Sequence, residues 1–212
     1  MTRYGKLLTA LLAGWFTFAL VGSALHLFTN AANQIGIAVA LSASSPILIF
    51  FLWFATSENF RRYTLSLDSK SLTSLQSWRV VGVVFVLMEA RGILPAIFAL
   101  PAGYGDIFIG ATASSVALWL AKPNYRNTFI VWQLLGITDL LTAVTLGTTA
   151  RLLDPHGPLM TPMTVLPLSL IPTFLVPLFF ILHVICIAQA KSWKKAVRPA
   201  SLPQTQAIRM VG

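Results

Sequence analysis

Long apolar runs separated by short polar connections dominate the chain. Each run is continuous rather than alternating, and a helix needs roughly 20 mostly apolar residues to cross a hydrocarbon core of about 30 Å. The pattern therefore predicts an all-α, polytopic membrane protein with six transmembrane helices. The expected spans are residues 7–28, 35–56, 80–100, 102–121, 128–149 and 163–188.

Composition points to the same class of protein. Of 212 residues, 56% are hydrophobic and only 10% are charged, and the mean hydropathy is +0.77. Soluble domains carry about a quarter charged residues. No connection is long enough to bury a core of its own, so we expect one transmembrane domain over residues 1–190 and a basic, disordered cytoplasmic tail over residues 191–212.

The net charge of +9 raises the question of nucleic-acid binding, but the positions of the basic residues argue against it. Thirteen of the fifteen lysines and arginines fall on alternating connections, as the positive-inside rule requires of cytoplasmic loops. Both termini are therefore expected in the cytoplasm, in agreement with an even number of spans in a cytoplasmic (inner) membrane. These residues are Arg3, Lys6, Arg61, Arg62, Lys70, Arg79, Lys122, Arg126, Lys191, Lys194, Lys195, Arg198 and Arg209.

The first apolar run has an alternative interpretation as a cleaved signal peptide over Met1–Ala24. Its apolar stretch is longer than the usual 7–15 residues of such peptides. Cleavage would also leave five spans and put the new N-terminus outside. A retained first span fits the charge pattern better.

The longest connection, residues 57–79, mixes aromatic, basic and hydroxyl residues. One interpretation is a short helix on the membrane surface capped by Asp68. The other is a solvated loop anchored by Trp78. In both cases the expected partners are the lipid bilayer and, for this basic loop and the tail, anionic lipid.

Ionisable residues inside predicted spans are the main functional candidates, because a charge at the bilayer centre costs about 2.5–3.5 kcal/mol on insertion scales. With Arg79 as the inner boundary of the third span, Glu89 lies about 15 Å deep and Arg91 about 18 Å deep. Asp139 lies about 20 Å above Arg126, and His183 about 12 Å above Lys191.

These depths predict an ion pair between Arg91 and Asp139 and a contact between Glu89 and His183. The charges of Glu89, Arg91 and Asp139 sum to minus one, and an unpaired buried carboxylate tends to take up a proton. One carboxylate is therefore expected to be protonated or to be neutralised by His183, and Glu89 is the candidate proton carrier. The alternative is that these contacts only hold the helices together.

Asp106 and His26 complete the set of candidates for a transport or proton pathway. Asp106 is predicted to cap the N-terminus of the fourth span. Counted from Lys122 it lies about 24 Å along the helix, below the outer surface. That depth suggests a vestibule at which Pro101–Gly105 turns inward, with His26 near the same face.

Several chemistries lack the residues that they need. The chain has no clustered histidines or cysteines for a metal and no GxSxG or P-loop motif, and Cys186 is its one cysteine. No cofactor, metal or catalytic residue is therefore predicted, which disfavours an enzyme.

The expected function is a transporter-like bundle that moves a small solute or ion, with proton coupling through Glu89. A non-transporting membrane subunit or sensor, whose buried charges serve assembly, is the alternative. A membrane-embedded enzyme acting on a lipid or quinone is the third. Assembly as a homo-oligomer or in a larger membrane complex stays open.

Overall fold

The computed structural model describes residues 3–29 and 36–193 of the chain, and within these ranges all regular elements are helices. Six of them are long and apolar enough to cross a membrane, which confirms the predicted number of spans. Their bounds are Tyr4–Ala24, Ile37–Thr56, Ser69–Glu89, Ala96–Trp119, Pro123–Leu153 and Ile171–Ser192. The protein is therefore a multi-pass membrane protein.

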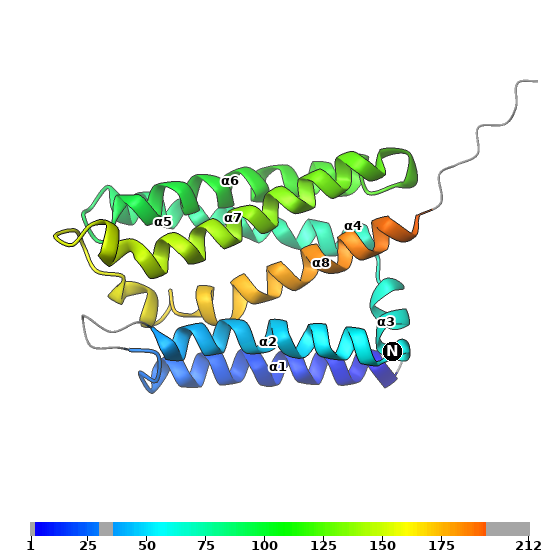
Figure 1. The fold of residues 1–212 in the computed structure, drawn as a ribbon, viewed down its shortest axis with the longest axis horizontal. Coiled ribbons are helices and arrows are strands. Elements are labelled where there is room, and N and C mark those ends of the chain that lie inside the picture. The colour runs from blue at the N-terminus through cyan, green and yellow to red at the C-terminus, as the bar shows by residue number, and fades with distance from the viewer. Residues whose placement is uncertain (1–2, 30–35, 194–212) are drawn as a thin grey trace, which may run out of the picture.

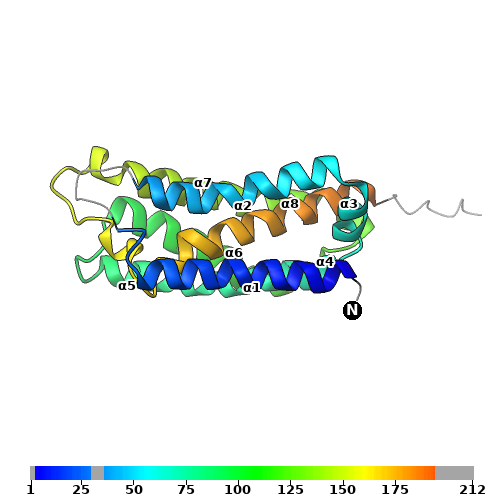
Figure 2. The same cartoon turned by 90° about the horizontal axis from the view of Figure 1, so that it is seen from below.

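The helices form three layers (Figure 1). Helices α1 (Arg3–Ala24) and α2 (Ile37–Thr56) make one outer layer, and α8 (Val176–Ser192) crosses the middle. The other outer layer holds the third span, α6 (Ala96–Trp119) and α7 (Arg126–Leu153). Figure 2 shows α8 between α1 and α2 when the molecule is viewed from below. Because α8 packs on α2 and α7, it is the helix around which the bundle is built.

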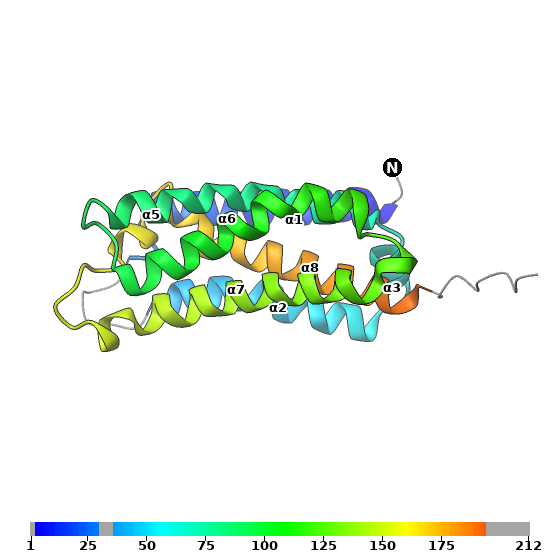
Figure 3. The same cartoon turned by 90° about the horizontal axis from the view of Figure 1, so that it is seen from above.

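The third span consists of three consecutive helices, α4 (Ser69–Ser74), the 3-10 helix η1 (Leu75–Gly82) and α5 (Val83–Glu89). Figure 3 shows this span beside α6, which crosses it at an angle. The span starts eleven residues before the predicted one, so the predicted bounds 80–100 were wrong. The error follows from assigning Arg79 to the membrane surface.

The end of the third span is set by Gly92, which has a φ of +66°. The amide of Gly92 donates to the carbonyl of Glu89, and the amide of Ile93 donates to the carbonyl of Met88. This pattern is a Schellman motif, in which a glycine in the left-handed conformation closes a helix. Arg91 lies in this closing turn rather than inside a span.

The connection before the third span contains a short helix, α3 (Glu58–Leu65), which buries Phe60 and Thr64. Ser57 caps it by accepting a hydrogen bond from the Phe60 amide at 3.3 Å. Asp68 is an N-cap, as predicted, but it caps α4 and so begins the third span. The connection is therefore shorter than residues 57–79.

The remaining elements are short and lie at the ends of the spans. They are η2 (Pro123–Tyr125), η3 (Thr161–Thr164) and η4 (Ile171–Leu175), of which η4 is a π-helical turn. Helix α1 begins and α8 ends at the same end of the bundle (Figure 1). From residue 194 onward, the predicted tail lies outside the described residues.

Candidate functional site

One face of the third span buries a residue at every third position. A 3-10 helix has three residues per turn, so residues three apart lie on the same face. In η1 this face carries Gln76, Arg79 and Gly82, which are buried, whereas Trp78 on another face is 70% exposed. Arg79 lies ten residues from each end of the span Ser69–Glu89. It is therefore about 15 Å from either end, near the middle of the bundle.

Arg79 binds side chains from the three other helices around it. Its Nε donates to Oδ1 of Asp106 on α6 at 2.7 Å, and its Nη2 pairs with Oδ2 of Asp139 on α7. Its Nη1 donates to the carbonyl of Gly136 at 3.3 Å and contacts Nε2 of His183 on α8 at 3.2 Å. We call Arg79, Asp106, Asp139 and His183 the Arg79 cluster.

The cluster holds one more carboxylate than it has cations. With neutral His183, the formal charges of Arg79, Asp106 and Asp139 sum to minus one. The guanidinium is 1% exposed, whereas the side chains of Asp106 and Asp139 retain 17% and 14% of their exposure. The cation is thus enclosed, and each aspartate side chain keeps some accessible surface.

A hydrogen-bonded chain extends the cluster toward the start of α4. His183 Nδ1 lies 2.5 Å from Oε1 of Gln133, whose Nε2 donates to Oγ1 of Thr73 at 3.2 Å. Thr73 in turn donates to the Ser69 carbonyl at 2.8 Å. His183, Gln133 and Thr73 are completely buried, so these hydrogen bonds satisfy polar groups that water does not reach.

Glycines make room for the charged side chains. A Cβ atom at Gly105 would collide with the carboxylate of Asp139, and one at Gly136 would collide with the ring of His183. A Cβ at Gly82 would collide with Asp106. Small residues commonly let membrane helices approach closely. Here they leave the space that three cluster side chains occupy.

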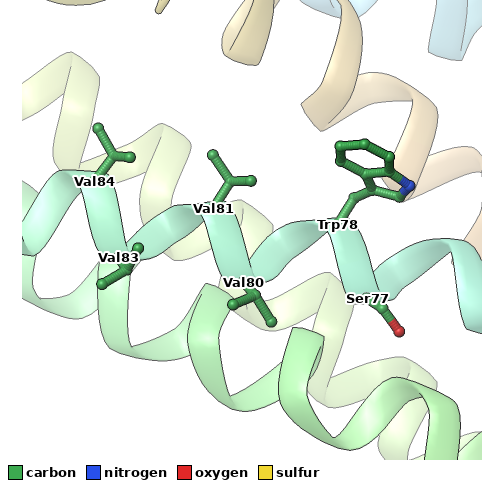
Figure 4. A pocket seen from close by; sticks show the side chains of 6 residues that line it. All are labelled: Ser77, Trp78, Val80, Val81, Val83 and Val84. Carbon is green, nitrogen blue, oxygen red and sulfur yellow. The ribbon is translucent and has the colours of Figure 1, made fainter.

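Two hollows lie along the third span, and one of them reaches the cluster. A cavity of about 30 Å³ is lined by Arg79 and Asp106 and has room for about one or two water molecules. A broad, open hollow of about 440 Å³ lies on the outer face of the third span. Figure 4 shows its apolar wall, with Trp78, Val81 and Val84 on one side of the helix. Trp78 and Val81 line both hollows.

The two predicted pairs were wrong. Asp139 pairs with Arg79 and not with Arg91, and His183 contacts Arg79 and Gln133 rather than Glu89. The depths were measured from Arg79 as a surface residue, although Arg79 itself is at the middle of its span. Glu89 and Arg91 therefore lie at the end of the bundle and not, as predicted, at mid-membrane.

The six predicted pathway residues divide into two groups. Asp106, Asp139 and His183 meet at Arg79, while Glu89 is half-buried at the end of α5 and Arg91 and His26 are exposed. His26 follows α1 with a φ of +57°. Asp106 does not cap α6, because this helix starts after Pro95 and runs without interruption through Pro101–Gly105. The predicted inward turn is therefore absent.

The prediction from sequence missed Arg79, Gln133 and Thr73. The signal that identifies this face of the third span is structural, because the buried residues at positions 73, 76, 79, 82 and 85 share a spacing of three. Within the described ranges no group of three or more histidine, cysteine or acidic side chains could hold a metal ion.

The chain belongs to the family described as "Domain of unknown function (DUF8737)", which matches residues 34–190. The match includes the whole Arg79 cluster and leaves out α1. A curated relative, the "Uncharacterized transporter YaaJ" of Escherichia coli (strain K12), is 30% identical over 166 residues. That alignment covers 72% of this chain but 34% of the relative, so the chain spans about a third of the relative's length. No solved structure matches the chain significantly.

Proposed function

We propose that this member of the family moves a small solute or ion across the membrane together with a proton held by the Arg79 cluster. The name of the E. coli relative supports transport in general terms. The cluster supports the coupling, because it joins ionisable side chains from four spans at mid-bundle. We assign to Asp106 and Asp139 the proton-carrying role that the sequence suggested for Glu89.

One observation carries this proposal: Arg79 pairs with two carboxylates at once. A pair that only joins helices needs one cation and one anion. An extra buried charge is costly in a low-dielectric interior, and a carboxylate relieves the cost by taking up a proton. Binding and release of that proton switch the net charge of the cluster between zero and minus one. This change in charge is the step to which movement of the solute would be coupled.

The bound proton is testable without knowing the solute. Infrared difference spectra of purified protein in lipid nanodiscs, recorded while the pH is raised, are expected to contain the C=O stretch of a buried protonated carboxyl group. Asp106→Asn or Asp139→Asn should remove that band, whereas Glu89→Gln should keep it. Persistence of the band in both aspartate variants would contradict the proposal.

Transport itself is testable in proteoliposomes that enclose a pH-sensitive dye. A panel of amino acids, organic acids and monovalent cations is added outside, and the internal pH is followed. Wild-type protein is expected to acidify the lumen with at least one class of solute, and Asp139→Asn should lose that response. Glu89→Gln is the matched control, since it removes a carboxylate outside the cluster.

The alternative function as a non-transporting subunit also has an observation in its favour. The Arg79 side chain is 1% exposed and its donors are occupied on three sides, as in a stationary helix-joining pair. Such a protein would show no solute-dependent acidification, although its excess carboxylate could still bind a proton. The transport experiment therefore separates the two functions.

The orientation in the membrane follows from the basic residues. We place both termini and the α3 connection on the cytoplasmic side of an inner membrane, because basic residues concentrate there. The common end of α1 and α8 supports an even number of crossings (Figure 1). In a Cys186→Ser background, a cysteine at exposed Ser66 should resist an impermeant maleimide in intact cells, and one at exposed His156 should react.

A further inference from the structure

We infer that His183 is a positioning residue, fixed as the neutral tautomer with its proton on Nδ1, and that the excess proton of the Arg79 cluster is therefore on Asp106 or Asp139. The tautomer follows from hydrogen-bond geometry alone. The location of the proton rests on the proposed function.

Arg79 decides the state of the histidine ring. A guanidinium has five N–H donors and no acceptor. Its Nη1 lies 3.2 Å from Nε2 of His183, so this nitrogen must accept and cannot carry a proton. A neutral imidazole has one donor and one acceptor nitrogen, which leaves Nδ1 as the donor.

The second nitrogen meets a matching acceptor. His183 Nδ1 faces Oε1 of Gln133 at 2.5 Å, and an amide oxygen only accepts. Turning the Gln133 amide around would bring its N–H₂ group against the Nδ1–H. The orientation of this amide is therefore fixed by Arg79 through the ring of His183.

The same direction of donation continues to the end of the chain. Gln133 Nε2 donates to Thr73 Oγ1, and the Thr73 hydroxyl donates to the Ser69 carbonyl. The hydroxyl proton of Thr73 is used there, so the contact of its oxygen with Cys186 Sγ at 3.7 Å has the thiol as donor. Each group in the chain donates away from Arg79.

Protonating His183 would disrupt this sequence of donors and acceptors at the contact between His183 and Arg79. A second ring proton at Nε2 would face an N–H of Arg79, and two cations would lie 3.2 Å apart in a buried site. The other groups around the ring do not change this result. They are Asp106 and Asp139 beyond the guanidinium, Cys186 on the same helix and the Trp132 ring, whose centroid lies 5.8 Å away.

The ionisable side chains of the cluster then leave few places for a proton. Arg79 keeps its charge in proteins, and the ring of His183 has no free nitrogen. The second oxygens, Oδ2 of Asp106 and Oδ1 of Asp139, are not bound by Arg79. They belong to the two partly accessible side chains of the cluster, so a proton can arrive there without breaking a hydrogen bond to Arg79.

Nitrogen NMR measures the tautomer directly, and the chain suits the experiment. Only three histidines are present, so His26→Gln with His156→Gln leaves His183 as the single one. Protein with ¹⁵N-labelled histidine, purified with a histidine-free tag in nanodiscs, is expected to show a protonated Nδ1 and a bare Nε2 throughout the neutral range. A protonated Nε2 or a doubly protonated ring would overturn the inference.

A conservative replacement separates positioning from proton carrying. In His183→Gln the amide oxygen can still accept from Arg79, so the carboxyl infrared band and solute-dependent acidification should persist, whereas His183→Leu should weaken both. Loss of solute-dependent acidification in His183→Gln while the carboxyl band persists, with Arg91→Gln as control, would make the ring itself a proton carrier and overturn the positioning role. If wild-type protein gave no band while NMR showed the Nδ1–H ring, the proposed function would fail and the tautomer would stand.

Discussion

Arg79 and Asp139 are 60 positions apart in the sequence and form an ion pair at the middle of the bundle. The same guanidinium binds Asp106 at 2.7 Å. One cation thus serves two carboxylates from two other helices. Removing the arginine and removing one aspartate must therefore have unequal effects on stability.

Replacing Arg79 by methionine is expected to destabilise the protein strongly. Breaking a buried ion pair by removing one partner costs about 3–5 kcal/mol, because the remaining charge is left uncompensated. Asp139→Asn should cost less, about 1–2 kcal/mol, since Arg79 keeps Asp106 and the net charge of the cluster changes from minus one to zero. The measurement is thermal unfolding followed by reaction of buried Cys186, the one cysteine of the chain, with a fluorogenic maleimide.

The control for this experiment is Arg91→Met, the same substitution at an exposed arginine. Its midpoint should stay close to that of the wild type. The double variant Arg79→Met with Asp139→Asn should be more stable than Arg79→Met alone, because one of the two orphaned carboxylates is gone. Equal midpoints for Arg79→Met and Arg91→Met would show that the ion pairs contribute nothing to stability.

The glycines around the cluster give a second prediction. Gly136→Ala and Gly105→Ala place a methyl group against His183 and Asp139, where no space exists. Overpacking of this kind costs about 1–3 kcal/mol, so both variants should unfold at lower temperature. They should also lose the carboxyl infrared band if the charged groups are displaced.

Gly14→Ala is the matched control, because a Cβ at Gly14 meets no atom within 4 Å. Alanine is the better helix former by up to about 1 kcal/mol, so this variant should equal or exceed the wild type in stability. A loss at Gly14 as large as at Gly136 would mean that helix propensity or membrane insertion, and not the packed cluster, limits these substitutions.

The six spans could be predicted from the sequence because membrane crossing depends on a simple quantity, the length of an apolar run. The length of an apolar run does not determine how each helix is rotated about its axis or which helices it packs against. Asp139 and His183 were recognised as buried ionisable residues, but their common partner was not. Pairing by depth alone connected them to residues that lie at the end of the bundle.

Arg79 was missed because a basic residue one position after Trp78 looks like an interface anchor. Placing Arg79 at the cytoplasmic surface agreed with the positive-inside rule. The distribution of basic residues therefore did not contradict this placement. The contrary signals were structural: Gly92 closes the helix after Arg91, and the buried face repeats every three residues through Gln76, Arg79 and Gly82. A 3-10 segment is rare enough that a period of 3.6 is assumed first.

Asp68 provides a prediction outside the membrane spans. Hydrogen bonds from the Ser71 hydroxyl and amide lower the pKa of this carboxylate below its ordinary value of 3.8. A lowered pKa means that the ionised form stabilises the folded state. The contribution is fully present above 3.8 and is lost as the pH falls through the lowered value.

Asp68→Ala should therefore lower stability by about 1 kcal/mol at neutral pH, the usual cost of losing an N-cap. The difference from the wild type should shrink as the pH drops below 3.8. Asp68→Asn keeps an acceptor without the charge, so its stability should vary less with pH over this range. A difference between Asp68→Ala and the wild type that stays constant to low pH would contradict the role of the charged cap.

One indole N–H contributes to the attachment of the first span. Pro177 has no amide hydrogen, so it cannot bond the carbonyl of Thr173 four residues earlier, as a helix would require. Trp15 Nε1 donates to that carbonyl at 3.1 Å, and the Trp15 ring packs on Phe174 with centroids 4.8 Å apart. Helix α1 thereby supplies the hydrogen bond that the proline removes.

Trp15→Phe keeps an aromatic ring but removes the donor, and it should cost about 1–3 kcal/mol because a carbonyl at a fully buried threonine is left unpaired. Trp119→Phe is the control, since Trp119 is 67% exposed. Thermal unfolding, followed by labelling of Cys186, compares the stabilities of the two variants with that of the wild type. Equal midpoints would mean that the indole N–H adds nothing to the attachment of α1, the helix outside the family match, and that the start of α8 tolerates an open carbonyl.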